Sequence, residues 1–184
     1  SSTVSVGTAP GPITVIPGSV TVPVTINRSS GSPAVMAFSV TFKVAPPLRL
    51  PSGKASIALG GFLNADGGRA INFQTLDLGL DGDGNHVYKA DGTTMGANCG
   101  SSTTSGTLFN ITLGASASGS GDVTLTSVLL RDCTNTDLLS VIGTASTVTA
   151  DLKVVLTMNT SGNGTVGQLP TPTAGKYELG TVVT

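Results

Sequence analysis

The chain of 184 residues contains no tryptophan, one histidine and one glutamate, and only 10% of its residues are charged. About 25% is usual for a soluble protein. Its nine Lys and Arg residues against ten Asp and Glu residues give a net charge of −1. This balance argues against nucleic-acid binding, which requires a concentrated basic surface, and against a polybasic membrane anchor. No run of 18 apolar residues is present to form a transmembrane helix.

Residues that favour exposed helix faces are scarce as well, because these are chiefly Lys, Arg and Glu. The chain instead holds 27 Thr, 20 Ser and 25 Gly. Valine is also abundant, and Val and Thr both suit a pleated sheet. The composition therefore predicts an all-β fold, and 39% hydrophobic residues suffice for the core of one full domain. The Thr-, Ser- and Gly-rich, Lys-poor composition also suggests a secreted or cell-surface protein.

Short apolar runs bounded by turn residues recur along the chain, and no helical pattern separates them. This spacing predicts about nine strands in a jelly-roll or Greek-key β-sandwich rather than a parallel α/β sheet. Pro23 cannot donate a backbone hydrogen bond, so its strand is expected at an edge or at a bulge. The predicted strands are residues 13–16, 20–26, 35–44, 57–59, 71–80, 87–89, 108–113, 123–130 and 148–156.

The composition changes near Asp151, which divides the chain into a sandwich of residues 1–151 and a β extension of residues 152–184. The extension is too short for a core of its own. At the other end, residues 3–6 can form a strand, although Gly7 and the Pro-Gly-Pro that follows separate it from the sandwich. Both terminal segments are therefore expected to offer unpaired strand edges to a neighbouring chain.

Two cysteines, Cys99 and Cys133, are the only ones in the chain. An even number in an exported β-protein is typical of a disulfide, which is the preferred interpretation. The alternative is a reactive or metal-binding pair. Two thiolates without a nearby histidine cannot complete a tetrahedral zinc site.

Oxygen ligands at alternate positions form two candidate calcium sites. Asp81, Asp83 and Asn85 have the spacing with which a loop can wrap a calcium ion, although the acidic residue that normally ends such a loop is missing. Asp-Gly and Gly-Asn steps are also ordinary hairpin-turn chemistry, and a turn is the preferred interpretation here. Residues 132, 135 and 137 (Asp, Asn and Asp) form a looser second cluster.

Catalytic patterns are weak in this sequence. A serine or cysteine triad would have to use His86, the only histidine, and its place beside a turn favours a solvated residue. The scattered acidic residues show no pairing of the kind that a glycosidase needs. A carbohydrate-binding module is the second hypothesis, for which Tyr88 and Tyr177 are the remaining candidates for exposed rings, since Phe38, Phe42 and Phe109 are expected in the core.

Several segments resemble a known family. Residues 20–26 (VTVPVTI) resemble the early VxVPVTI strand of cohesin modules, and residues 35–44 follow where that family places its next core strand. Residues 106–113 (GTLFNITL) and 123–132 (VTLTSVLLRD) are similar to two later cohesin strands. Residues 1–151 therefore resemble a cohesin. The resemblance implies a nine-stranded jelly roll that is not catalytic and that binds dockerin modules through one sheet face, without assigning any contact residue.

The extension carries a second resemblance. Residues 156–159 (LTMN), 162–166 (GNGTV) and 177–184 (YELGTVVT) look like the first half of an internalin-type B-repeat, which occurs in bacterial surface proteins. The sequence as a whole favours a non-catalytic, extracellular β-sandwich module. Such a module would act through contact with another protein or with copies of itself, without nucleic acid, membrane insertion or a required cofactor.

Overall fold

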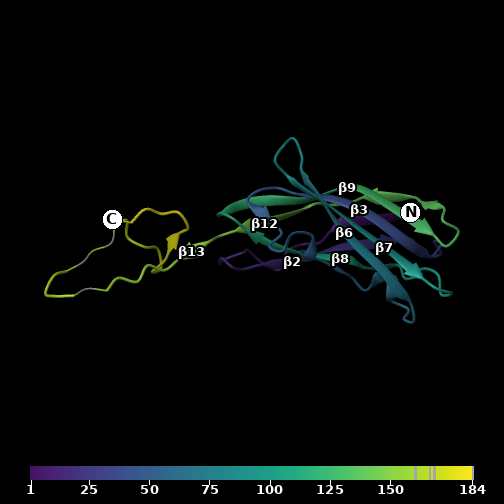
Figure 1. Cartoon of the computed structure of the whole chain (residues 1–184), viewed down its shortest axis with the longest axis horizontal. Coiled ribbons are helices and arrows are strands. Elements are labelled where there is room, and N and C mark those ends of the chain that lie inside the picture. The colour runs from purple at the N-terminus through teal and green to yellow at the C-terminus, as the bar shows by residue number, and fades with distance from the viewer. Residues whose placement is uncertain (160, 166, 168, 184) are drawn as a thin grey trace.

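The computed structural model describes residues 1–159, 161–165, 167 and 169–183. Two β-sheets pack face to face as a sandwich, and the C-terminal segment extends beyond one end of it (Figure 1). This arrangement confirms the predicted all-β sandwich. Among the described residues, no helix is long and apolar enough to cross a membrane.

Six strands form the first sheet: β1 (Ser2–Val6), β2 (Val20–Arg28), β4 (Leu48–Arg49), β5 (Ile57–Leu59), β8 (Ser105–Ala115) and β11 (Ser140–Ile142). Their order is β11-β1-β2-β8-β4, and β5 also pairs with β8. All pairs are antiparallel except β1 with β11, which is parallel. Two 3₁₀-helices, η1 (Gly53–Ser56) and η2 (Phe62–Asn64), flank β5 in the chain.

Six further strands form the second sheet: β3 (Val35–Val44), β6 (Ala70–Leu80), β7 (His86–Met95), β9 (Gly119–Asp132), β10 (Asp137–Leu138) and β12 (Ser146–Ala150). Their order is β10-β9-β3-β7-β6, and β12 also pairs with β9. Every pair is antiparallel. The central strand β3 contacts β9 and β7 along almost its whole length.

The core lies between the two sheets and follows the alternation seen in the sequence. Along β3, Phe38, Val40 and Phe42 point inward and are at most 3% exposed. The ring of Phe109 from the opposite sheet lies 6.0 Å from the ring of Phe38 and 5.7 Å from that of Phe42. The three phenylalanines are therefore core residues, as predicted, and they join the two layers through stacked rings.

The prediction that the N-terminal segment lies apart from the sandwich is wrong for β1. This strand pairs with β2 on one side and with β11 on the other, and Val4 and Val6 are buried in the core. The partner β11 is more than 130 residues away along the chain, so no local pattern indicates the pairing. The edge of this sheet is therefore β11 rather than β1.

One further detail of the strand prediction is wrong and another is confirmed in one of its two alternatives. Residues 13–16 form no strand, because Ile13 makes only an isolated bridge to Ala150 and Pro17 follows closely. Pro23, predicted at an edge or at a bulge, lies on the central strand β2 beside a bulge between Val24 and Thr25. Its carbonyl accepts a hydrogen bond from Gly7 N at the end of β1. The missing Pro23 N–H faces that same side, where β1 has ended, so it breaks no ladder bond.

The C-terminal extension is held at few points. Leu152 packs against the core, and β13 (Lys153–Val154) pairs with β14 (Tyr177–Glu178), which buries Tyr177. The predicted strand at 148–156 is thus divided between β12 and β13. Positions 166 and 184 of the B-repeat motif lie outside the described residues.

Candidate functional site

The outer face of β9, β3, β7 and β6 is the candidate functional site. The register aligns outward-pointing side chains of the four strands in rows across the sheet. On β3, Ala37 lies between Thr93 of β7 and Arg131 of β9. In the next row, Ser39 lies between Asp91 and Leu129. Two small side chains on the central strand are therefore flanked by longer ones on both sides.

This difference in side-chain length hollows the sheet surface above β3. The resulting cavity, which we call the β3 trough, has a volume of about 280 Å³. Concave, mainly apolar sites with a few polar groups are the usual form of a binding pocket. The trough is lined by Ala37, Phe38, Ser39, Asn72, Gln74, Asp91, Gly92, Thr93, Leu129 and Arg131.

Charged groups stand on both walls of the trough. On the β7 side, Asp91 Oδ2 lies 3.4 Å from Lys89 Nζ. The other oxygen, Asp91 Oδ1, is covered and accepts no hydrogen bond from any part of the chain that the structure describes. On the β9 side, Arg131 pairs with Asp137 at 3.2 Å and donates to the carbonyl and side-chain oxygens of Asn135. The Arg131 wall is thus fixed, whereas the Asp91 wall keeps an unused acceptor.

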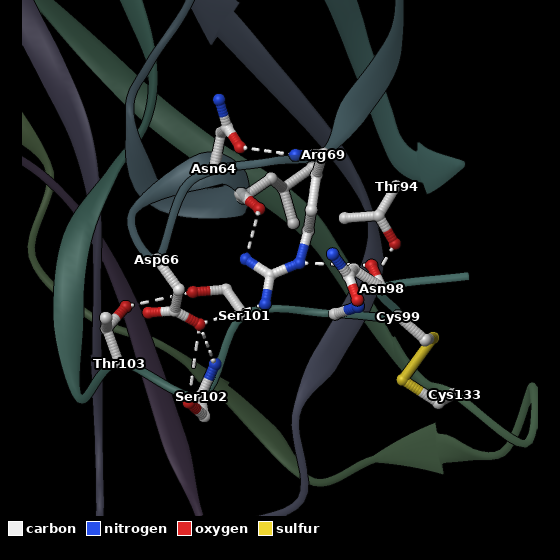
Figure 2. Close-up of polar contacts among 12 residues, drawn as sticks. Asn64, Asp66, Arg69, Thr94, Asn98, Cys99, Ser101, Ser102, Thr103 and Cys133 are labelled. Carbon is white, nitrogen blue, oxygen red and sulfur yellow. Dashed lines mark hydrogen bonds and ion pairs between the residues drawn. A yellow bond between two sulfur atoms is a disulfide. The ribbon is translucent and has the colours of Figure 1, made fainter. Parts of the chain in front are cut away.

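A cluster of polar contacts fixes the loops at the end of the sandwich nearest to Ala37 and Arg131. Figure 2 shows Arg69 at its centre: the guanidinium donates to the carbonyls of Leu63 and Asn98 and pairs with Asp66 at 2.9 Å. The Asp66 carboxylate also accepts hydrogen bonds from Ser102. The Arg69 guanidinium holds the pKa of Asp66 below its usual range. These contacts tie the start of β6 to the loop that precedes β8.

The predicted disulfide is present beside this cluster. Cys99 and Cys133 are bonded, with their Cα atoms 5.8 Å apart (Figure 2). Cys133 directly follows β9 and is two residues from Arg131. The bond therefore joins the end of β9 to the loop before β8 and closes a separation of 34 residues.

The same loop encloses a buried cation. Arg28 is 5% exposed and donates to the carbonyls of Ser101, Thr103 and Pro33. Burial lowers the pKa of Arg28 from its ordinary value. Ser101 and Thr103 lie in the loop before β8, and Pro33 lies in the loop after β2. The guanidinium, which has five N–H donors, therefore holds two separate loops together.

The structure shows how the turn at residues 81–85 is built. Asp81 Oδ1 accepts hydrogen bonds from the backbone N–H groups of Asp83 and Asn85, and Oδ2 accepts one from the Asn85 side chain. The Asn85 side chain and backbone hold the pKa of Asp81 below its usual range. This is the expected hydrogen bonding of an Asx turn. Calcium binding by Asp81, Asp83 and Asn85 stays a prediction.

The second oxygen cluster is divided between two structural roles. Asp132 Oδ1 accepts hydrogen bonds from the Thr134 backbone and hydroxyl and from Thr136 N, and the Thr134 hydroxyl contributes most to lowering the pKa of Asp132. Asn135 and Asp137 contact Arg131 instead. Throughout the described part of the chain, no three His, Cys, Asp or Glu residues are grouped so that they could hold a metal ion.

His86 begins strand β7 and is engaged on two sides. Its Nε2 lies 2.6 Å from Asp77 Oδ1, and its ring stacks on that of Tyr88 with centroids 4.5 Å apart. The hydrogen bond from His86 lowers the pKa of Asp77. The expectation of exposed tyrosine rings for carbohydrate binding is wrong, because Tyr88 and Tyr177 are only 3% and 4% exposed.

Comparisons with known proteins give the fold. No family model and no curated protein matches the sequence. Among solved structures, a non-cellulosomal cohesin from the archaeon Archaeoglobus fulgidus matches with a TM-score of 0.54 and 16% identity, over 81% of this chain and 90% of that one. The chain has a cohesin fold. The cohesin-like prediction is thus confirmed for the fold, whereas the comparisons lend no support to the internalin-type repeat.

Other similar structures are also cohesins. A cohesin–dockerin complex of OlpA from Clostridium thermocellum has a TM-score of 0.57 and 12% identity, and covers 82% of this chain and 99% of that one. The cohesin module of a family 33 glycoside hydrolase from Clostridium perfringens has a TM-score of 0.55 and 12% identity, and covers 80% and 98%. At these identities the likeness concerns the cohesin fold alone.

The β3 trough itself was absent from the sequence-based expectations. Its residues come from four strands, and what defines it is the register between them. The only local signal is the pair of small outward residues, Ala37 and Ser39, on a strand whose inward residues are large.

Proposed function

We propose that this chain is a non-catalytic module of a secreted or cell-surface protein, and that it binds another protein through the outer face of β9, β3, β7 and β6. The observation that carries the proposal is the β3 trough, a hollow above the central strand of this sheet. A central concave patch with an apolar floor and a polar rim is where interface energy concentrates.

The cohesin fold supports a protein partner. One of the similar structures, that of OlpA from Clostridium thermocellum, is a complex of a cohesin with a dockerin. Secretion or surface display is supported by the disulfide, which persists in oxidising compartments. The partner is a different protein or a second copy of this chain, and the test below separates these outcomes.

Site-specific photo-crosslinking tests the proposal. A benzophenone amino acid replaces Ser127, which is exposed on the same sheet face one row from the trough, so that the trough itself stays open. In a control protein it replaces Thr21, which is exposed on the outer face of the opposite sheet. After irradiation in secreted material of the source organism, the Ser127 variant should form an adduct with one protein, identified by mass spectrometry. An excess of unlabelled chain should compete this adduct away.

A plugged trough provides the second arm. Ala37→Trp fills the hollow from its floor. An excess of this variant should therefore fail to compete the adduct away, although its circular dichroism stays that of the wild type. Adducts of equal yield from the Thr21 control would contradict the proposed face. An adduct with the same chain would identify self-association, and glycan-array binding that is lost in Ala37→Trp would favour a carbohydrate ligand instead.

A further inference from the structure

The two walls of the β3 trough differ in chemistry, and the difference constrains what can fill it. We propose that the trough receives a tyrosine side chain of the partner protein, with the ring against Leu129 and Arg131 and the hydroxyl donating to Asp91. This inference deepens the proposed function and rests on it.

The size of the trough fits a single side chain. Pockets for drug-sized ligands have volumes of about 300–1,000 Å³, whereas the trough has about 280 Å³ and is open on one side. Its apolar lining includes Ala37 on the floor and Leu129 on the wall. A flat ring that covers both would exclude water from them, and large aromatic side chains are the commonest anchors of protein interfaces.

Asp91 requires a hydrogen-bond donor. Its Oδ1 atom is buried without a partner among the described residues, and an unsatisfied buried acceptor is unfavourable. The side chain as a whole keeps 34% of its surface exposed. Because rotation about the terminal bond of an aspartate is soft, either oxygen can turn to a donor that enters the trough.

Charge decides which donor is favoured. Lys89 lies next to Asp91, and Arg131 lines the opposite wall. An incoming lysine or arginine would meet both cations, whereas a phenol is neutral. The guanidinium of Arg131 also interacts favourably with an aromatic face. A phenylalanine would gain the ring contacts but would leave Asp91 without its donor.

The test compares two soluble probes that differ by one hydroxyl. N-acetyl-tyrosinamide and N-acetyl-phenylalaninamide are titrated into the ¹⁵N-labelled full chain, and amide shifts are followed by NMR. The tyrosine probe should shift residues of the trough and bind about tenfold more tightly, the effect of a hydrogen bond to a charged acceptor. Asp91→Ala should remove this difference, whereas Asp83→Ala, at the exposed turn between β6 and β7, should preserve it.

Several results would overturn the inference. These are equal affinity for the two probes, shifts outside the trough, no shift with either probe, or tighter binding of methyl glucoside at the same residues. A crosslink at Ser127 combined with any of these results would leave the proposed function intact and reject only the tyrosine. A selective tyrosine response without a Ser127 adduct would reject the protein-binding face instead.

Discussion

The sandwich and the C-terminal extension both contain many β-forming residues but are held in different ways. In the sandwich, each strand places alternate side chains against a second sheet, and Phe42, Phe109 and Ile111 are fully buried. In the extension, Val155, Leu169 and Val182 are 65%, 68% and 79% exposed. Both regions are rich in Val and Thr. The comparison shows that β-forming residues become a stable layer only where another layer covers them.

Truncating a core ring should break the sandwich most severely. Phe109→Ala removes the ring that stacks on both Phe38 and Phe42. We expect the free energy of unfolding to fall by about 3–5 kcal/mol. Urea denaturation followed by circular dichroism measures this, since the chain has no tryptophan for fluorescence. A loss below about 1 kcal/mol would show that the two sheets are not coupled through these rings.

Removing the disulfide should have the next largest effect. The bond closes a separation of 34 residues, for which the chain-entropy relation gives about 3–4 kcal/mol. The double variant Cys99→Ser, Cys133→Ser should therefore melt at a lower temperature in calorimetry and keep its β circular dichroism. Reduced wild-type protein should match the variant, and the variant should not respond to reductant. Free thiols in freshly isolated protein would contradict the assignment.

An exposed contact of the sandwich should matter much less. Asp77→Asn keeps an acceptor for Gly79 N but removes the charge that faces His86. At 42% exposure, the pair should contribute less than about 1 kcal/mol. Because His86 lowers the pKa of Asp77, the contribution is present above the ordinary carboxyl pKa of about 3.9 and disappears as the pH falls through the lower folded value.

Denaturant midpoints of this variant and wild type should thus differ at pH 6 and converge toward pH 2. Asp83→Asn, at the exposed turn, is the matched control. The difference between its denaturant midpoint and that of the wild type should not shrink in this way between pH 6 and pH 2. A difference that grows on acidification would reverse the sign of the coupling and contradict the role of Asp77.

Changes in the extension should have the smallest effect on the sandwich. Tyr177 is as buried as many core residues, yet Tyr177→Ala should alter the midpoint of sandwich unfolding by less than about 1 kcal/mol. Its effect should be local, because in the part of the chain that the structure describes β14 pairs only with β13. Limited proteolysis should cut the variant faster within residues 153–183, with the sandwich fragment left intact. Cooperative loss of the whole fold would show that the extension is part of the sandwich.

The sequence predicts the long strands well and the short edge strands poorly, for a physical reason. Alternation along residues 35–44 and 123–130 reflects burial on one side, and these strands lie at the centre of their sheet. The position of β1 depends on β11, more than 130 residues away. The strand predicted at residues 87–89 is longer in the structure, where β7 continues to Met95. Asp91 and Thr93 extend its outward face, but these polar residues and Gly92 hide the alternation in the sequence.

The candidate site shows the same limit. Spacing in the chain grouped Asn135 and Asp137 with Asp132 as oxygen ligands, whereas the fold assigns both to Arg131. The β3 trough requires the lateral register of four strands, which one strand's sequence does not contain. The disulfide was predictable because only one pairing of two cysteines exists.

The bulge in β6 between Asp77 and Gly79 has a consequence for solubility. β6 is an edge strand of eleven residues, it carries no lysine, arginine or proline, and Leu78 and Leu80 are 52% and 71% exposed. A straight strand of this kind is a template for amyloid-like stacking. The extra residue bends and twists the strand so that a second copy cannot lie flat along its whole length. A single inserted residue thus limits the straight part of this exposed border to residues 70–77.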